Sequence, residues 1–114
     1  MDNILTFEQS NNLYNNQYGG SIRLTNVPVG YMMEGLKRYL EDGVEPGNFL
    51  YSLLSNDLQN TFAHADEQNS KKLRQWVQWC YNTLPISAWG SPERVDEWMR
   101  QQSKPETRWT YTFV

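Results

Sequence analysis

The chain is poor in the two side chains that most often carry chemistry. Its 114 residues include one cysteine, Cys80, and one histidine, His64. A lone cysteine excludes an internal disulfide and favours a reducing, intracellular setting. A lone histidine fits neither the ligand spacing of a zinc site nor a Ser-His-Asp arrangement. We therefore expect no metal, no cofactor and no enzymatic activity.

Long apolar runs and clustered bases are also missing. No stretch approaches the ~20 apolar residues that cross a bilayer, and the start, Met1-Asp2-Asn3, does not resemble a signal peptide. Thirteen acids outweigh ten bases, for a net charge of −3. The densest basic cluster, around Lys71-Lys72, is typical of a solvated helix start, whereas nucleic-acid binding requires a larger basic patch. We expect neither a membrane nor a nucleic acid as direct partner.

Aromatic residues, by contrast, are abundant. They make up 14% of the chain and include five tryptophans. A chain of this length fits one domain that buries roughly 65% of the surface exposed by its unfolded form. Residues 1–21 are rich in Asn, Gln, Ser and Gly and lack an apolar period, which predicts a flexible polar arm ahead of a single domain over 22–114.

Apolar periodicity predicts a mostly α, compact three- or four-helix domain with a small two-stranded β-ribbon. Gly43 is expected as a left-handed C-cap, and Ser91, followed by Pro92, as an N-cap. The ribbon would pair the N- and C-terminal flanks, because both alternate in hydrophobicity. The expected helices are 28–42, 46 to 55 or 64, 66–84 and 91–102, and the expected strands are 21–27 and 108–114.

Asn56-Asp57 interrupts the apolar stripe of the second helix and leaves two interpretations open. If that helix is continuous, Asp57 and His64 lie on its inner face and form a polar pocket with Asn56. If it breaks, Asn56 or Asp57 caps a short following helix, which is the preferred role of such residues. Capping or a satisfied buried hydrogen bond is the favoured interpretation.

The third helix is expected to carry its apolar stripe toward the core and to begin at an Asp66 N-cap. Cys80 lies on that stripe and is interpreted as a buried structural residue. Trp79 points away from the stripe and is expected on the surface. The predicted stripe consists of Leu73, Trp76, Val77, Cys80 and Leu84.

A set of spaced residues resembles a known group of proteins. The set runs from Pro28-x-x-x-Met32 through Gly43-Val44, Pro46-Gly47 and Asn56-Asp57-Leu58 to Trp89-Gly90-Ser91-Pro92-Glu93 and Trp98. Over residues 28–98 this pattern is similar to a family of small proteins encoded by bacteriophages and prophages. The resemblance implies a phage accessory role in the host bacterial cytoplasm. That family carries no assigned reaction, so no catalytic residues are transferred.

Surplus aromatic residues suggest a binding function, because Trp and Tyr commonly anchor protein interfaces. We expect stoichiometric binding to a host protein of a defence or regulatory system, with a homo-oligomer also possible. Trp89 is instead expected to plug one end of the helical domain. The predicted partner-binding residues are Trp79, Trp109, Tyr111, Phe113 and Tyr31.

Three alternatives belong to other classes. A nucleotide signal would be sequestered between protomers, with Tyr39 stacking on the base and Lys37 and Arg38 binding phosphate. An enzyme would have to use Asp57, His64 and Asp66. The third alternative is a minor virion or assembly component.

Overall fold

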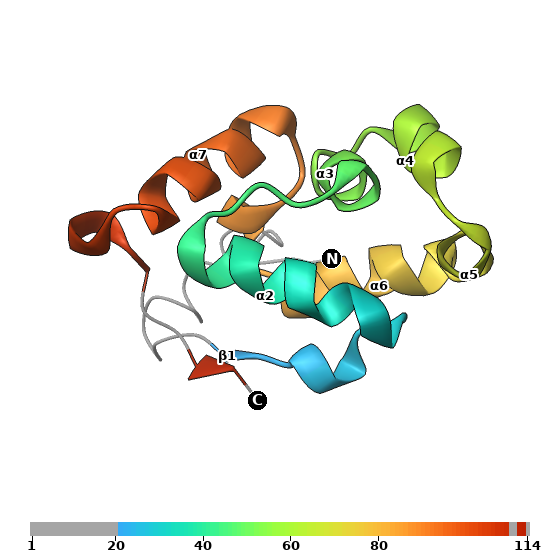
Figure 1. The fold of residues 1–114 in the computed structure, drawn as a ribbon, viewed down its shortest axis with the longest axis horizontal. Coiled ribbons are helices and arrows are strands. Elements are labelled where there is room, and N and C mark those ends of the chain that lie inside the picture. Colours follow the sequence, from blue (N-terminus) through green and yellow to red (C-terminus); the bar gives the residue numbers. More distant parts are fainter. Residues whose placement is uncertain (1–20, 110–111, 114) are drawn as a thin grey trace, which may run out of the picture.

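The computed structural model describes residues 21–109 and 112–113, and this part of the chain is mostly helical and compact, as the sequence predicts (Figure 1). Its α-helices are α2 (Met33–Asp42), α3 (Asn48–Leu54), α4 (Leu58–His64), α5 (Glu67–Lys71), α6 (Leu73–Thr83) and α7 (Pro92–Gln102). Short 3-10 turns are η1 (Leu24–Asn26), η2 (Gly30–Met32), η3 (Ile86–Ala88) and η4 (Pro105–Thr107).

In the described part of the chain, six α-helices replace the expected three or four because two predicted helices are divided. The second helix breaks between Leu54 and Leu58, and the third breaks at Lys72, whose φ of −117° and ψ of 23° are not helical. Two helix starts were also predicted too early. The first α-helix begins at Met33 after a 3-10 turn, and the second at Asn48, two residues beyond Pro46.

The structure does not support the β-ribbon of two longer strands that the sequence predicts. The described flanks pair only over two residues each, β1 (Ser21–Ile22) with β2 (Thr112–Phe113), and the pairing is parallel. Most of the expected 21–27 strand is a 3-10 turn, Leu24–Asn26. The predicted polar arm and Tyr111 lie outside the described residues.

One hydrophobic core gathers side chains from α2, α3, α6 and α7. Trp76 stands edge-on to both Phe49 and Trp79, with ring centroids 5.9 and 6.0 Å apart. Such edge-to-face pairs are a favoured aromatic geometry. Fully buried members include Leu36, Tyr39, Leu40, Leu54, Trp76, Cys80, Leu84, Val95 and Trp98.

Local capping signals fix several helix ends as predicted. Gly43 ends α2 with a φ of 69°, in the left-handed region that glycine tolerates. The Ser91 hydroxyl accepts a hydrogen bond from the Arg94 backbone N–H at 3.2 Å and caps α7. The Asp66 carboxylate accepts from the Asn69 N–H at 2.8 Å and caps α5.

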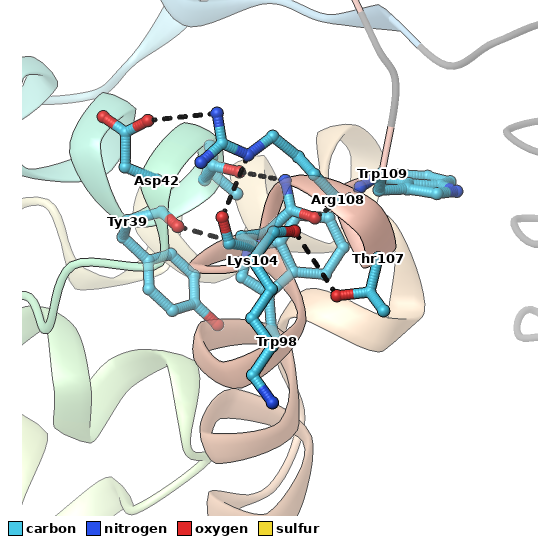
Figure 2. A network of polar contacts seen from close by, with 9 residues as sticks. Tyr39, Asp42, Trp98, Lys104, Thr107, Arg108 and Trp109 are labelled. Carbon is cyan, nitrogen blue, oxygen red and sulfur yellow. Dashed lines mark hydrogen bonds and ion pairs between the residues drawn. The ribbon is translucent and has the colours of Figure 1, made fainter.

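A buried glutamine holds the C-terminal segment against α2 and α7, within the polar network around Asp42, Arg108 and Trp109 that Figure 2 draws. Gln102 is 0% exposed. Its amide donates to the Leu40 carbonyl at 3.0 Å and accepts from the Trp109 backbone N–H at 2.6 Å. The Arg108 side chain donates to the Gln102 carbonyl at 3.0 Å and lies 3.7 Å from the Asp42 carboxylate. The segment after α7 is therefore an integral part of the fold.

Candidate functional site

The most exposed large apolar side chains of the described residues lie on α4. Leu58 is 78% exposed and Phe62 is 64% exposed, and they stand one helical turn apart. Together with Gln59 and Ala63 they line an open apolar depression. We call these four residues the α4 face.

A left-handed turn between α3 and α4 sets the direction of this face. Asn56 adopts a φ of 64°, and the N–H groups of Asn56 and Asp57 donate to the carbonyls of Leu53 and Ser52 at 3.1 and 2.9 Å. This is the Schellman pattern of hydrogen bonds, which ends a helix and turns the chain. Asparagine is among the few residues that tolerate this conformation.

Asp57 then starts α4. Its carboxylate accepts from the Asn60 backbone N–H at 3.2 Å and from the Asn60 side-chain amide at 2.8 Å. These hydrogen bonds lower the pKa of the Asp57 carboxyl. The residue therefore carries its charge at neutral pH beside Leu58.

Only one residue of α4 is buried. Thr61 is 4% exposed, and its hydroxyl donates to the Asp57 carbonyl at 2.6 Å. The helix packs chiefly on α3 and lies at the end of the molecule away from α7 (Figure 1). Since Thr61 points inward, Leu58 and Phe62 remain in solvent.

An aspartate also lies just beyond the far end of α4. The Tyr31 hydroxyl donates to the Asp66 carboxylate, which also caps α5. The hydrogen bond from Tyr31 is the main cause that lowers the pKa of Asp66, and the same contact raises the pKa of Tyr31. Carboxylates thus flank α4 at both ends, Asp57 before it and Asp66 after it.

The polar pocket considered from the sequence does not form, because the second helix breaks. Asn56 and His64 are exposed, and Asp57 is a cap at the opposite end of α4 from His64. Of the two interpretations left open, capping is the one observed. The aspartates and the histidine of the enzyme alternative are likewise spread over both ends of a helix about 10 Å long.

The predicted exposure of Trp79 is wrong. Its side chain is 5% exposed, and its indole N–H donates to the Arg23 carbonyl at 3.4 Å. The segment that begins with Ile22 and Leu24 packs into the core and covers this side of α6. Val77, expected on the inner stripe, is instead 50% exposed.

The other predicted contact aromatics differ in exposure. Tyr31 is 56% exposed, as expected. Trp109 is partly buried, and its ring lies 5.4 Å from the Trp98 ring at 79°. Tyr111 and the side chain of Phe113 lie outside the part of the chain that the structure describes. Trp89, predicted as a plug, packs partly buried against the core, and its indole N–H has no hydrogen-bond partner among the described residues.

The structure also bears on the predicted nucleotide site and on the predicted role of Cys80. Tyr39, the expected stacking ring of the nucleotide site, is 0% exposed, and its hydroxyl donates to the Ala88 carbonyl at 2.6 Å. Lys37 and Arg38 therefore lack that aromatic platform. Cys80 is buried as predicted, and burial raises the pKa of its thiol to about 12.

Within residues 21–109 and 112–113, no three or more His, Cys, Asp or Glu side chains come together as metal ligands. Across the same residues, no helix combines the length and apolarity needed to cross a membrane. Comparison with known proteins gave no matching family model and no match among curated proteins or solved structures.

Proposed function

We propose that this protein acts by stoichiometric binding of a partner protein, and that the α4 face is its main contact. The observation that carries the proposal is the exposure of Leu58 and Phe62 on one face of a helix that buries only Thr61. Burial of a leucine or phenylalanine side chain contributes about 1.5–3 kcal/mol. The fold leaves this free energy available for association.

The resemblance to phage-encoded accessory proteins suggests where the protein acts and which kind of partner it binds. The partner is a host protein in the bacterial cytoplasm, and binding inhibits a host defence or regulatory system. The anchors differ from those expected from the sequence, because Trp79 belongs to the core. Tyr31 remains an exposed aromatic residue, and its hydrogen bond to Asp66 links it to the loop after α4.

Capture from host lysate tests this function. Tagged wild-type protein is expected to retain a host protein in equal molar amount. Phe62→Ser is expected to retain at least about ten-fold less of that protein, because it removes the side chain that the partner would bury. Val77→Ser is the matched control, since Val77 is also a half-exposed apolar helix residue but lies on α6.

Three results would contradict the proposal. The first is equal capture by Phe62→Ser and wild-type protein, and the second is equal loss with both substitutions. The third is conversion of a host metabolite by trace amounts of the purified chain, because a stoichiometric binder does not turn over. Circular dichroism of each variant verifies that the helices are retained.

A further inference from the structure

In the sequence, the α4 face lies within a stretch rich in acidic residues, and two of these acids, Asp57 and Asp66, directly flank α4. Residues 39–70 contain six acidic residues and neither lysine nor arginine, whereas the rest of the chain carries seven acids and all ten bases. The six acids are Glu41, Asp42, Glu45, Asp57, Asp66 and Glu67. Two of them have basic partners, Glu67 with Lys71 at 3.3 Å and Asp42 with Arg108 at 3.7 Å.

From this arrangement we infer that the partner segment seated on the α4 face is a basic amphipathic helix. Its apolar residues, one turn apart, would pack on Leu58 and Phe62. Its lysine or arginine residues would meet Asp57 at one end of α4 and Asp66 at the other. This inference rests on the proposed function and adds the chemistry of the partner.

Charge argues against a second copy of the chain as the occupant. In a two-fold symmetric dimer the same patch lies on both sides of the interface. Pairing two α4 faces would therefore oppose Asp57 and Asp66 of one copy with those of the other. The four residues of the face are also far fewer than the roughly 20–30 per side of a standard interface. A single helix of a partner fits the size of this surface better.

The same charge argues against three other occupants. The chain's own first 22 residues carry two acids, Asp2 and Glu8, and no lysine or arginine, so their charge has the wrong sign. Anionic lipid surfaces and nucleic acids are repelled by an acidic site for the same reason. A basic peptide helix combines the opposite charge with the apolar stripe that the face requires.

The geometry keeps the acidic ends of the site in fixed positions. Asp57 is held by Asn60, and Asp66 by Asn69 and by Tyr31. Both are helix caps, so their positions relative to Leu58 and Phe62 follow from the backbone. Asparagine also caps helices well. Asp57→Asn with Asp66→Asn therefore removes two charges and retains both caps.

Fluorescence anisotropy with a labelled synthetic helix tests the inference. The probe carries leucine at i, i+3, i+4 and i+7 spacing and lysine elsewhere, and a second probe has glutamate in place of every lysine. We expect one lysine probe to bind per chain. Affinity for the lysine probe should fall about ten-fold or more with Phe62→Ser and several-fold with Asp57→Asn/Asp66→Asn. Added salt should also lower this affinity, because it screens the attraction between charges.

Two control variants distinguish binding of the lysine probe at the α4 face from nonspecific attraction of that probe to an acidic protein. Glu93→Gln with Glu106→Gln removes the same charge from α7 and η4, and Val77→Ser removes an apolar side chain from α6. Both are expected to leave the affinity for the lysine probe unchanged within about two-fold.

The inference is overturned if the lysine probe does not bind, if the glutamate probe binds as tightly, or if the control variants lose as much affinity as the α4 variants. It is also overturned if sedimentation shows a dimer of the wild-type chain that Phe62→Ser dissociates. Lysate capture that depends on Phe62 would, in those cases, still support the proposed function, so the two failures are distinguishable.

Discussion

Gly43 occupies a position that no other residue fits without strain. Its φ is 69°, and a Cβ atom there would lie 2.3 Å from the Met99 carbonyl oxygen and 2.9 Å from the Ser103 backbone nitrogen. Both atoms belong to the main chain at the end of α7, so they cannot move aside cheaply. The close approach of α2 and α7 therefore depends on the missing side chain.

We predict that Gly43→Ala lowers the free energy of unfolding by about 3 kcal/mol, because left-handed strain and a backbone clash add. Urea denaturation measures this. Gly30→Ala serves as control, since nothing lies within 4 Å of a Cβ atom at Gly30, and a change under about 0.5 kcal/mol is expected there. Equal stability of Gly43→Ala and wild type would refute the account.

Cys80 is enclosed in the core. It is 0% exposed, and burial raises the pKa of its thiol to about 12, so the reactive thiolate is scarce. We predict no reaction with a thiol reagent under native conditions and one labelled thiol per chain in denaturant, as measured by mass spectrometry. Complete labelling of the native protein within minutes would show that the side chain is accessible.

At the level of elements, the segment after α7 depends on one amide. Gln102 links the Leu40 carbonyl to the Trp109 N–H, and the Thr107 hydroxyl donates to the Gln101 carbonyl at 2.8 Å nearby. The partners of Gln102 are 62 and 7 residues away along the chain. The amide thus joins α2, α7 and the C-terminal flank.

We predict that Gln102→Met, which keeps the volume, destabilises the fold by about 2–3 kcal/mol, because it removes the hydrogen bonds of the buried Gln102 amide to the Leu40 carbonyl and the Trp109 N–H. Urea denaturation measures the loss, and hydrogen exchange should show faster exchange at Trp109. Gln78→Met on the exposed side of α6 should change neither quantity. Unchanged exchange at Trp109 in Gln102→Met would contradict this role.

Helix ends could be predicted from the sequence because their causes are local. Ser91 and Asp66 bond to residues three positions later, and Gly43 turns the chain directly after α2. Features that depend on distant segments could not be predicted. Trp79 is buried because the N-terminal flank lies over α6, and Gln102 was expected only as a helix end.

The α4 face was missed for a related reason. The sequence interpretation weighed only Asp57 and His64 in this stretch. On a continuous helix, Leu58 and Phe62 would project together, roughly opposite Phe49, and this placement was a signal present in the sequence. The break at Asn56 changes the path of the chain, but the pair remains outside the core.

At the scale of the whole molecule, acid should weaken the fold through its capping aspartates. Hydrogen bonds lower the pKa of Asp57 and Asp66 below the ordinary value of 3.8. A group with a lowered folded-state pKa contributes stability above its unfolded pKa, and this contribution is lost as the pH falls through the folded value. The affected window therefore lies below about pH 4.

We predict a nearly constant urea midpoint from about pH 7 to 5 and a lower midpoint near pH 3. The Asp57→Asn/Asp66→Asn variant should show a smaller decline between pH 5 and 3, because asparagine retains the caps without titrating. An equal decline in both proteins would assign the acid sensitivity to other carboxyl groups.

Because Thr61 is the one buried residue of α4, the exposed side of this helix is open to sequence change. Positions 58, 59, 62 and 63 contribute little to the core, so selection for folding constrains them weakly. New side chains there would change which surface is recognised while the scaffold stays intact. Under the proposed function, this separation would let the protein acquire a different partner through a few substitutions.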